Sequence, residues 1–63
     1  MTYREVEKRL KENGWVVARQ KGSHVQFVHR TTGKTVTVPN HAGKDISPGV
    51  MGDLKRKTGL SFQ

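Results

Sequence analysis

Apolar residues near the start of the chain recur at helical spacing. Val6 and Leu10 are four residues apart, and Tyr3 lies one turn before Val6, so the three form one narrow apolar stripe on a helix. Asn13-Gly14 follows, a pair suited to the left-handed conformation that ends many helices. The pattern predicts a first helix over residues 3–13.

The middle of the chain changes to short runs of strand-forming residues. β-Branched and aromatic residues dominate the segments 15–20, 24–30 and 35–38, and the third alternates polar and apolar positions. Turn residues separate the three segments, as Lys21-Gly22-Ser23 and as Thr31-Thr32-Gly33. Because both connections are short, the sequence predicts an antiparallel meander of three strands.

A second helical pattern follows a polar loop. Ser47-Pro48 combines an N-cap residue with a proline at the first helical position, where the missing N–H costs nothing. Val50 and Leu54 are again four residues apart, and Gly59 provides an end. The final element is therefore predicted as a helix from Ser47-Pro48 to Gly59.

Two further details concern the helices. Thr2 and Glu5 have the spacing of a capping box, in which each side chain satisfies a backbone N–H of the other residue. Gly49 and Gly52 are poor helix residues, each less favourable than alanine by about 1 kcal/mol. Close packing of the second helix against the sheet would explain these two glycines.

The predicted order is α-β-β-β-α, an α+β fold with one three-stranded antiparallel sheet. Each helix has a single apolar stripe, so both helices are expected on the same face of the sheet. The other face is left for solvent or a partner. At 63 residues and 7.1 kDa the chain allows one small domain, spanning residues 1–63.

Charge narrows the choice of partner. The chain has 12 Lys and Arg against 5 Asp and Glu, a formal net charge of +7. No acidic residue occurs between Glu12 and Asp45, and this acid-free stretch contains Arg19, Lys21, His24, His29, Arg30, Lys34, His41 and Lys44. Such a surface attracts a polyanion, and nucleic acid is the favoured one. An acidic protein partner, or solubility alone, are the alternatives.

Composition excludes several other classes. The absence of cysteine excludes disulfides and thiolate zinc sites, and agrees with a cytoplasmic location. The longest apolar run, residues 15–18, is too short to cross a membrane. No metal-binding motif, phosphate-binding glycine loop or nucleophile elbow is present. We therefore expect no metal and no cofactor.

The segment Gly22-Ser23-His24 is the strongest candidate for chemistry. Histidine is the side chain that exchanges a proton near neutral pH, and here it begins a strand beside a basic turn. With RNA as substrate, it could take the proton of a 2′-hydroxyl, which then attacks the neighbouring phosphate. From these three residues alone, a surface histidine that hydrogen-bonds a loop is an equally simple interpretation, and it is the commoner one.

Two other histidines and a C-terminal cluster are less specific. The second hairpin should return His41 to the neighbourhood of Ser23 and His24, whereas alternation places His29 on the opposite sheet face, in a structural role. The cluster Lys55-Arg56-Lys57 either complements the dipole of the last helix or adds to a binding surface.

Taken in order, the motifs resemble those of the HicA toxins. They are Asn13-Gly14-Trp15, Lys21-Gly22-Ser23-His24, Val36-Thr37-Val38-Pro39 with His41 and Lys44, and a last helix from Ser47-Pro48-Gly49 to Thr58-Gly59-Leu60. The resemblance implies a fold like the double-stranded-RNA-binding domain. It also implies an mRNA interferase of a type II toxin–antitoxin pair, neutralised by a HicB antitoxin, with His24 as the catalytic histidine.

The leading hypothesis is thus a metal-independent RNA endonuclease in which His24 is the general acid or base. The alternatives are an RNA-binding module without catalysis and a small interaction protein for an acidic partner. The expected RNA-binding residues are Arg19, Lys21, Gly22, Ser23, Lys34, His41 and Lys44.

Overall fold

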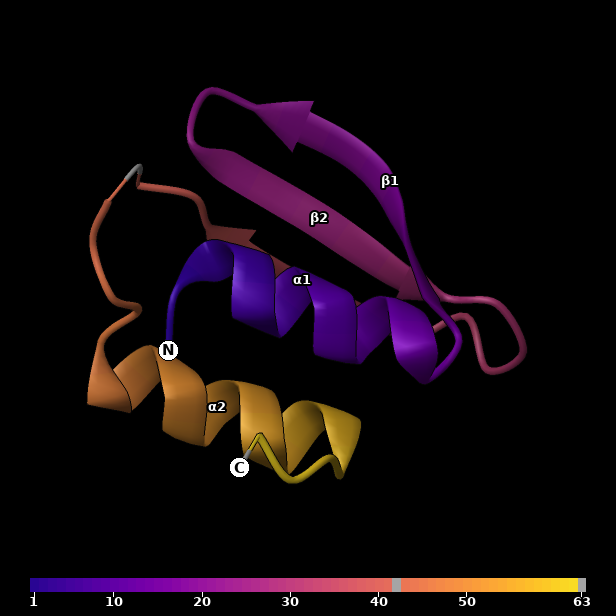
Figure 1. The fold of residues 1–63 in the computed structure, drawn as a ribbon. Helices are drawn as coiled ribbons and strands as arrows, with labels where there is room; N and C mark the ends of the chain where they lie inside the picture. Colours follow the sequence, from indigo (N-terminus) through magenta and orange to yellow (C-terminus); the bar gives the residue numbers. More distant parts are fainter. Residues whose placement is uncertain (42, 63) are drawn as a thin grey trace.

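The computed structural model describes residues 1–41 and 43–62 and contains the predicted elements in the predicted order (Figure 1). They are α1 (Tyr3–Glu12), β1 (Trp15–Lys21), β2 (His24–His29), β3 (Thr35–Pro39) and α2 (Pro48–Thr58). The predicted boundaries differ from these by at most one residue at either end. The α-β-β-β-α order and the three-stranded antiparallel sheet are confirmed.

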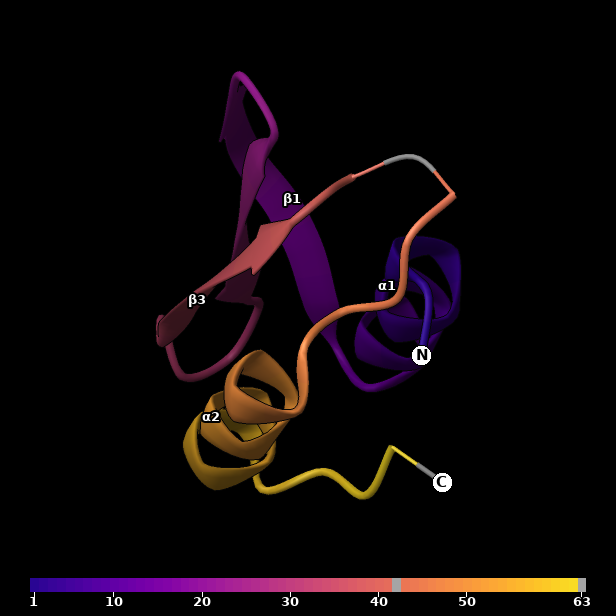
Figure 2. The same cartoon turned by 90° about the vertical axis from the view of Figure 1, so that its left-hand side faces the viewer.

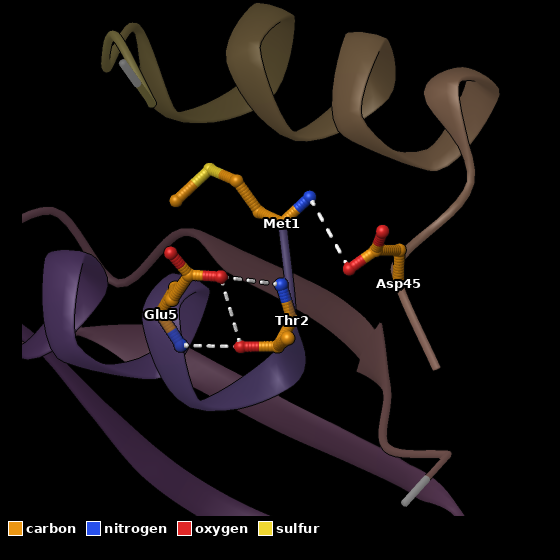
Figure 3. Close-up of polar contacts among 4 residues, drawn as sticks. All are labelled: Met1, Thr2, Glu5 and Asp45. Carbon is orange, nitrogen blue, oxygen red and sulfur yellow. Dashed lines mark hydrogen bonds and ion pairs between the residues drawn. The ribbon is translucent and has the colours of Figure 1, made fainter. Parts of the chain in front are cut away.

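The start of α1 is held by the predicted capping box (Figure 3). The backbone N–H of Thr2 donates to Glu5 Oε1 at 2.9 Å, and the Glu5 N–H donates to Thr2 Oγ1 at 3.3 Å. The bond from the Thr2 N–H, together with a second from the Thr2 hydroxyl to Glu5 Oε1 at 3.1 Å, lowers the pKa of the Glu5 carboxyl, because both favour its charged form. At α2, Ser47 Oγ accepts from the Val50 N–H, and Gly59 ends the helix with a φ of +71°.

The sheet has the strand order β1-β2-β3, with both pairs antiparallel. Within β2 and β3 the inward-facing residues are Val25, Phe27, Val36 and Val38, which pair across the two strands as Val25 with Val38 and Phe27 with Val36. Because successive residues of a strand point to opposite faces, the residues between them lie on the outer face.

One hydrophobic cluster forms the core. Its buried members are Tyr3, Val6, Leu10, Trp15, Val25, Phe27, Val36, Val38, Ile46, Leu54 and Phe62. Both helices contribute to this cluster together with the inward-facing strand residues, which supports the prediction that both cover the same sheet face. The ribbon views agree, with α1 and α2 on one side of the strands (Figures 1 and 2). The opposite face of the sheet is therefore open.

The loop between β3 and α2 is held by the segment that precedes α1. Ile46 donates its backbone N–H to Met1 O at 2.7 Å, and Thr2 forms a β-bridge with Asp45. The Met1 amino group also lies 4.0 Å from Asp45 Oδ1 (Figure 3). These contacts place the loop beside the N-terminal end of α1.

The packing explanation for the two glycines of α2 is wrong. A Cβ atom built on Gly49 or Gly52 would meet no atom within 4 Å, and both residues are exposed. No neighbour therefore requires glycine there. Since α2 forms despite them, its stability comes from its caps and from burial of Leu54.

Candidate functional site

A β-bulge in β1 decides which side chains reach the open sheet face. Val17 pairs with Phe27, whereas Arg19 pairs with Gln26, so Ala18 is the extra residue. Without this bulge, Arg19 would lie opposite the buried Val25 and share its face. The shift moves Arg19, and Lys21 after it, to the outer face.

His24 lies on the same outer face. It pairs with Lys21 on one side and with Pro39 on the other, and its side chain is exposed. A shallow hollow of about 140 Å³ lies there, and its lining residues are Arg19, Lys21, His24, Gln26 and Thr37. The hollow thus brings together three of the predicted site residues, two from β1 and one from β2, and Thr37 of β3 completes its lining.

The turn before His24 explains the glycine at position 22. Gly22 and Ser23 form a two-residue hairpin loop in which Gly22 has a φ of +59° and Ser23 does not have a positive φ, as a type II′ turn requires. Ser23 O accepts a hydrogen bond from the Asn40 N–H at 2.6 Å. Together the turn and this bond fix the first residue of β2, which is His24.

The hollow is positively charged and lacks a carboxylate. Arg19 Nε donates to the side-chain oxygen of Gln26 at 3.0 Å. In the part of the chain that the structure describes, neither Arg19 nor Lys21 forms an ion pair or a hydrogen bond with an acidic side chain. The arrangement offers a proton-transfer group beside cations that are free to bind an anion.

His41 and Lys44 lie in the loop after β3 and do not line the His24 hollow. They line a separate cleft with Asn40, Gly43 and the first residues of α1. The predicted return of this segment toward Ser23 is correct for Asn40, which hydrogen-bonds Ser23. The cleft is therefore next to the His24 end of the sheet but separate from the hollow.

Lys34 lies at the other end of the sheet. It precedes Thr35, which pairs with Val28, whereas His24 pairs with Pro39 at the end of β3. Four residues of strand separate the two pairs, about 13 Å of extended chain. Any RNA contact of Lys34 is thus remote from His24.

His29 has a structural environment. Its ring lies edge-on to Trp15 with centroids 5.2 Å apart, and its Nε2 is 3.1 Å from Asn13 O. Its Nδ1 accepts from the backbone N–H groups of Thr31 and Thr32. Since Nδ1 accepts and Asn13 O cannot donate, the proton belongs on Nε2, and the ring joins the first helix end to the second hairpin.

The sequence interpretation did not include Gln26 and Thr37 in the site, or the bulge at Ala18. The two polar residues alternate with buried ones along β2 and β3, so the strand pattern places them on the outer face. No residue type marks the bulge, because Ala18 suits either geometry. Among residues 1–41 and 43–62 there is no group of three potential metal ligands.

Comparison with known families agrees with this geometry. Residues 3–60 match the family described as "HicA toxin of bacterial toxin-antitoxin". The chain belongs to the HicA toxin family. The resemblance identified from the motifs is thereby confirmed, and membership implies an antitoxin as partner of this HicA chain. A search of curated proteins returned no match.

The family assignment covers all five elements, including the turn with His24 and the hollow beside it. In the described part of this HicA chain, no helix has the length and apolar character needed to cross a bilayer.

Proposed function

We propose that this HicA toxin is an mRNA interferase that cleaves RNA without a metal, with His24 as a general acid or base. The observation that carries the proposal is the exposed His24 in a hollow whose other lining includes Arg19 and Lys21. Membership of a toxin family and the net charge of +7 support RNA as the substrate.

The chemistry needs few groups. The neutral imidazole of His24 takes the proton of a 2′-hydroxyl while that oxygen forms a bond to the adjacent phosphorus. The bond from phosphorus to the 5′-oxygen of the next nucleotide breaks, and a second proton donor on the opposite side of the phosphorus, such as a water molecule, protonates that oxygen. The products are a 2′,3′-cyclic phosphate and a 5′-hydroxyl end.

Cations beside the reacting phosphate would supply the remaining stabilisation. Arg19 and Lys21 lie on the His24 face, and no carboxylate of the described chain pairs with either of them. Their charge is thus available to the negative charge that develops on the phosphoryl oxygens. Arg19, Lys21, Gly22 and Ser23 would hold the reacting nucleotide.

More distant basic residues would bind the flanking chain. Lys44 and His41 line the cleft that also includes Asn40, the hydrogen-bond partner of Ser23, and Lys34 lies at the far end of the sheet. Contacts at these positions would follow the RNA backbone away from the cleavage site. They are expected to affect affinity more than the rate of cleavage.

The decisive experiment compares wild-type protein with His24→Ala in the presence of a chelator. The substrates are one RNA sequence and its fully 2′-O-methylated copy. Wild type should cleave the RNA, leave the methylated copy intact and generate cyclic phosphate ends. His24→Ala should bind both and cleave neither, with an unchanged circular dichroism spectrum and thermal midpoint, since the exposed imidazole contributes little to the core.

Thr35→Ala is the matched control, because Thr35 is exposed on the same sheet face at its other end. Its cleavage rate should equal that of wild type. Cleavage of RNA by His24→Ala at the wild-type rate would refute the catalytic assignment. RNA binding without cleavage by the wild type would favour a non-catalytic binding module.

A further inference from the structure

Arg19 and Gln26 form a directed pair on the open sheet face. They lie opposite each other across β1 and β2, immediately after the bulge, and Arg19 Nε donates to Gln26 Oε1 at 3.0 Å. A guanidinium N–H can only donate, so the carbonyl oxygen of Gln26 must face it. The Gln26 amide N–H₂ then points away from Arg19.

The pair leaves donors unused at the hollow. In the described chain, the two terminal nitrogens of Arg19 and the Gln26 amide nitrogen have no protein partner. Both residues line the hollow that contains His24. Planar pairs of guanidinium N–H groups match the oxygens of a phosphate, to which they bind in bidentate fashion.

The neutral partner of Arg19 is physically significant. A carboxylate at position 26 would hold the guanidinium equally well but would cancel its charge, as Asp53 does for Arg56 in α2. Glutamine fixes the orientation of the guanidinium and leaves its charge for a ligand. Holding a long, exposed side chain in one rotamer costs entropy, and a surface contact of this kind returns little stability.

We propose that Gln26 is a positioning residue, which orients the Arg19 guanidinium so that its terminal N–H groups bind the RNA phosphate beside His24. The proposal rests on the proposed function for its ligand. The bulge at Ala18 is the backbone feature that makes the pair, because it alone brings Arg19 opposite Gln26 and onto the His24 face.

The test measures RNA binding in the His24→Ala background, so that cleavage does not interfere. Four variants are added to this background: Arg19→Ala, Gln26→Leu, the double variant, and Gln26→Glu. A single-stranded RNA oligonucleotide is the probe, titrated at several salt concentrations, and Thr35→Ala is again the matched control. Thermal midpoints of all variants establish that they are folded.

Arg19→Ala should weaken binding by at least about tenfold, because a charged hydrogen-bonded contact is lost. It should also reduce the magnitude of the log K against log salt slope by about 0.7, the value for one single-strand phosphate contact. Gln26→Leu should weaken binding by about threefold or more when Arg19 is present. In the Arg19→Ala background the same substitution should have no effect.

Gln26→Glu separates orientation from charge. The glutamate keeps an acceptor for Arg19 Nε but neutralises the guanidinium, so binding should weaken as much as in Arg19→Ala. A purely structural role for Gln26 would instead leave affinity unchanged in Gln26→Leu, which removes the acceptor without adding a charge. That result, or an equal loss from Gln26→Leu with and without Arg19, would overturn the positioning role.

These outcomes are independent of the catalytic proposal. If His24→Ala still cleaves RNA, the catalytic assignment fails, while the coupling between Arg19 and Gln26 can be measured on the uncleavable 2′-O-methylated RNA. If the coupling is zero on this RNA also, the positioning role fails by itself.

Discussion

The two basic clusters of this HicA toxin differ in what surrounds their charges. In α2, Asp53 pairs with Arg56 and lies 3.0 Å from Lys57 Nζ, and the cluster occupies the last helical turn. On the sheet, Arg19 has a neutral glutamine as its partner, and Lys21 is paired across the strands with His24.

This difference separates structural charge from available charge. Cations in the last turn of α2 complement the helix dipole and an adjacent carboxylate, so most of their charge is balanced locally. The cations of the acid-free stretch have no such balance in the described chain. The sequence alone left the role of Lys55-Arg56-Lys57 open, and the ion pairs to Asp53 favour the local role.

The largest expected effect on RNA affinity comes from reversing the charges of the sheet cluster, Arg19 and Lys21, in comparison with those of the α2 cluster. In the His24→Ala background, Arg19→Glu with Lys21→Glu should weaken RNA binding by about a hundredfold, since attraction becomes repulsion at the phosphate. Arg56→Glu with Lys57→Glu makes the same change of charge in α2, and should alter affinity less than about threefold. Fluorescence anisotropy with labelled RNA measures both.

The two double variants have the same net charge, so they control for long-range attraction. Equal losses of affinity would mean that RNA responds to overall charge and that the open sheet face has no special role. Melting curves should show the opposite order, with the α2 variant the less stable, because acidic residues at a helix C-terminus oppose its dipole.

A smaller effect of charge reversal is expected on binding of the antitoxin. We expect an acidic HicB-like partner to cover His24 directly, so it should compete with RNA for the His24→Ala toxin and raise its thermal midpoint. Lys21→Glu should weaken the binding of both RNA and the antitoxin, and Lys44→Glu should weaken both as well. Lys57→Glu is the matched control and should affect neither.

Simultaneous binding of RNA and antitoxin would contradict direct occlusion. So would a loss of RNA affinity in Lys21→Glu with no change in antitoxin affinity. Isothermal titration of each variant with the antitoxin, followed by RNA titration of the complex, distinguishes these results.

Most of the fold was predictable because its signals are local. The capping box at Thr2, Pro48 at the first position of α2 and the Gly22-Ser23 turn each fix a boundary through chemistry within four residues. The placement of His24 and His29 on opposite faces of the sheet was also predictable, since strand alternation needs no tertiary information.

What escaped prediction depends on contacts between segments. The bulge at Ala18 follows from how β1 fits β2 and the core, and a single alanine gives no sign of it. The separation of His41 and Lys44 from the His24 hollow depends on the loop after β3, which contacts between Met1, Asp45 and Ile46 hold near α1. The roles of His24, Arg19 and Lys21 in catalysis and RNA binding remain predictions.

A still smaller effect, on stability alone, is expected from a substitution in α2 away from the open sheet face. Gly52→Ala should raise stability by about 1 kcal/mol, because alanine is the better helix former and its Cβ meets no neighbour within 4 Å. For a domain of this size the thermal midpoint should rise by roughly 4–8 °C. RNA affinity should not change.

Gly59→Ala is the matched control for this substitution. Gly59 also has open space around its Cβ position, but its φ of +71° strains any other side chain. It should lower the thermal midpoint. Destabilisation by Gly52→Ala would mean that α2 packs more closely than the structure indicates.

The smallest expected effect is a pH dependence that reports directly on the α2 cluster. The Lys57 ammonium hydrogen-bonded to Asp53, with the nearby Arg56 guanidinium, lowers the pKa of Asp53 below its ordinary value of 3.8. A carboxyl with a lowered folded-state pKa contributes stability that is present above its unfolded pKa and is lost as pH falls through the folded one. Glu5 behaves alike, because its bonds with Thr2 also lower its pKa.

The thermal midpoint should therefore fall on acidification from about pH 5 downward, and Asp53→Asn should remove part of this fall and leave the part due to Glu5. Carboxyl titration by NMR gives the two pKa values directly. If the thermal midpoints of Asp53→Asn and wild type fell equally on acidification, Asp53 would have no stabilising interaction with its cations. Arg56 and Lys57 would then be as available as Arg19 and Lys21, and the distinction between the two clusters would have to be abandoned.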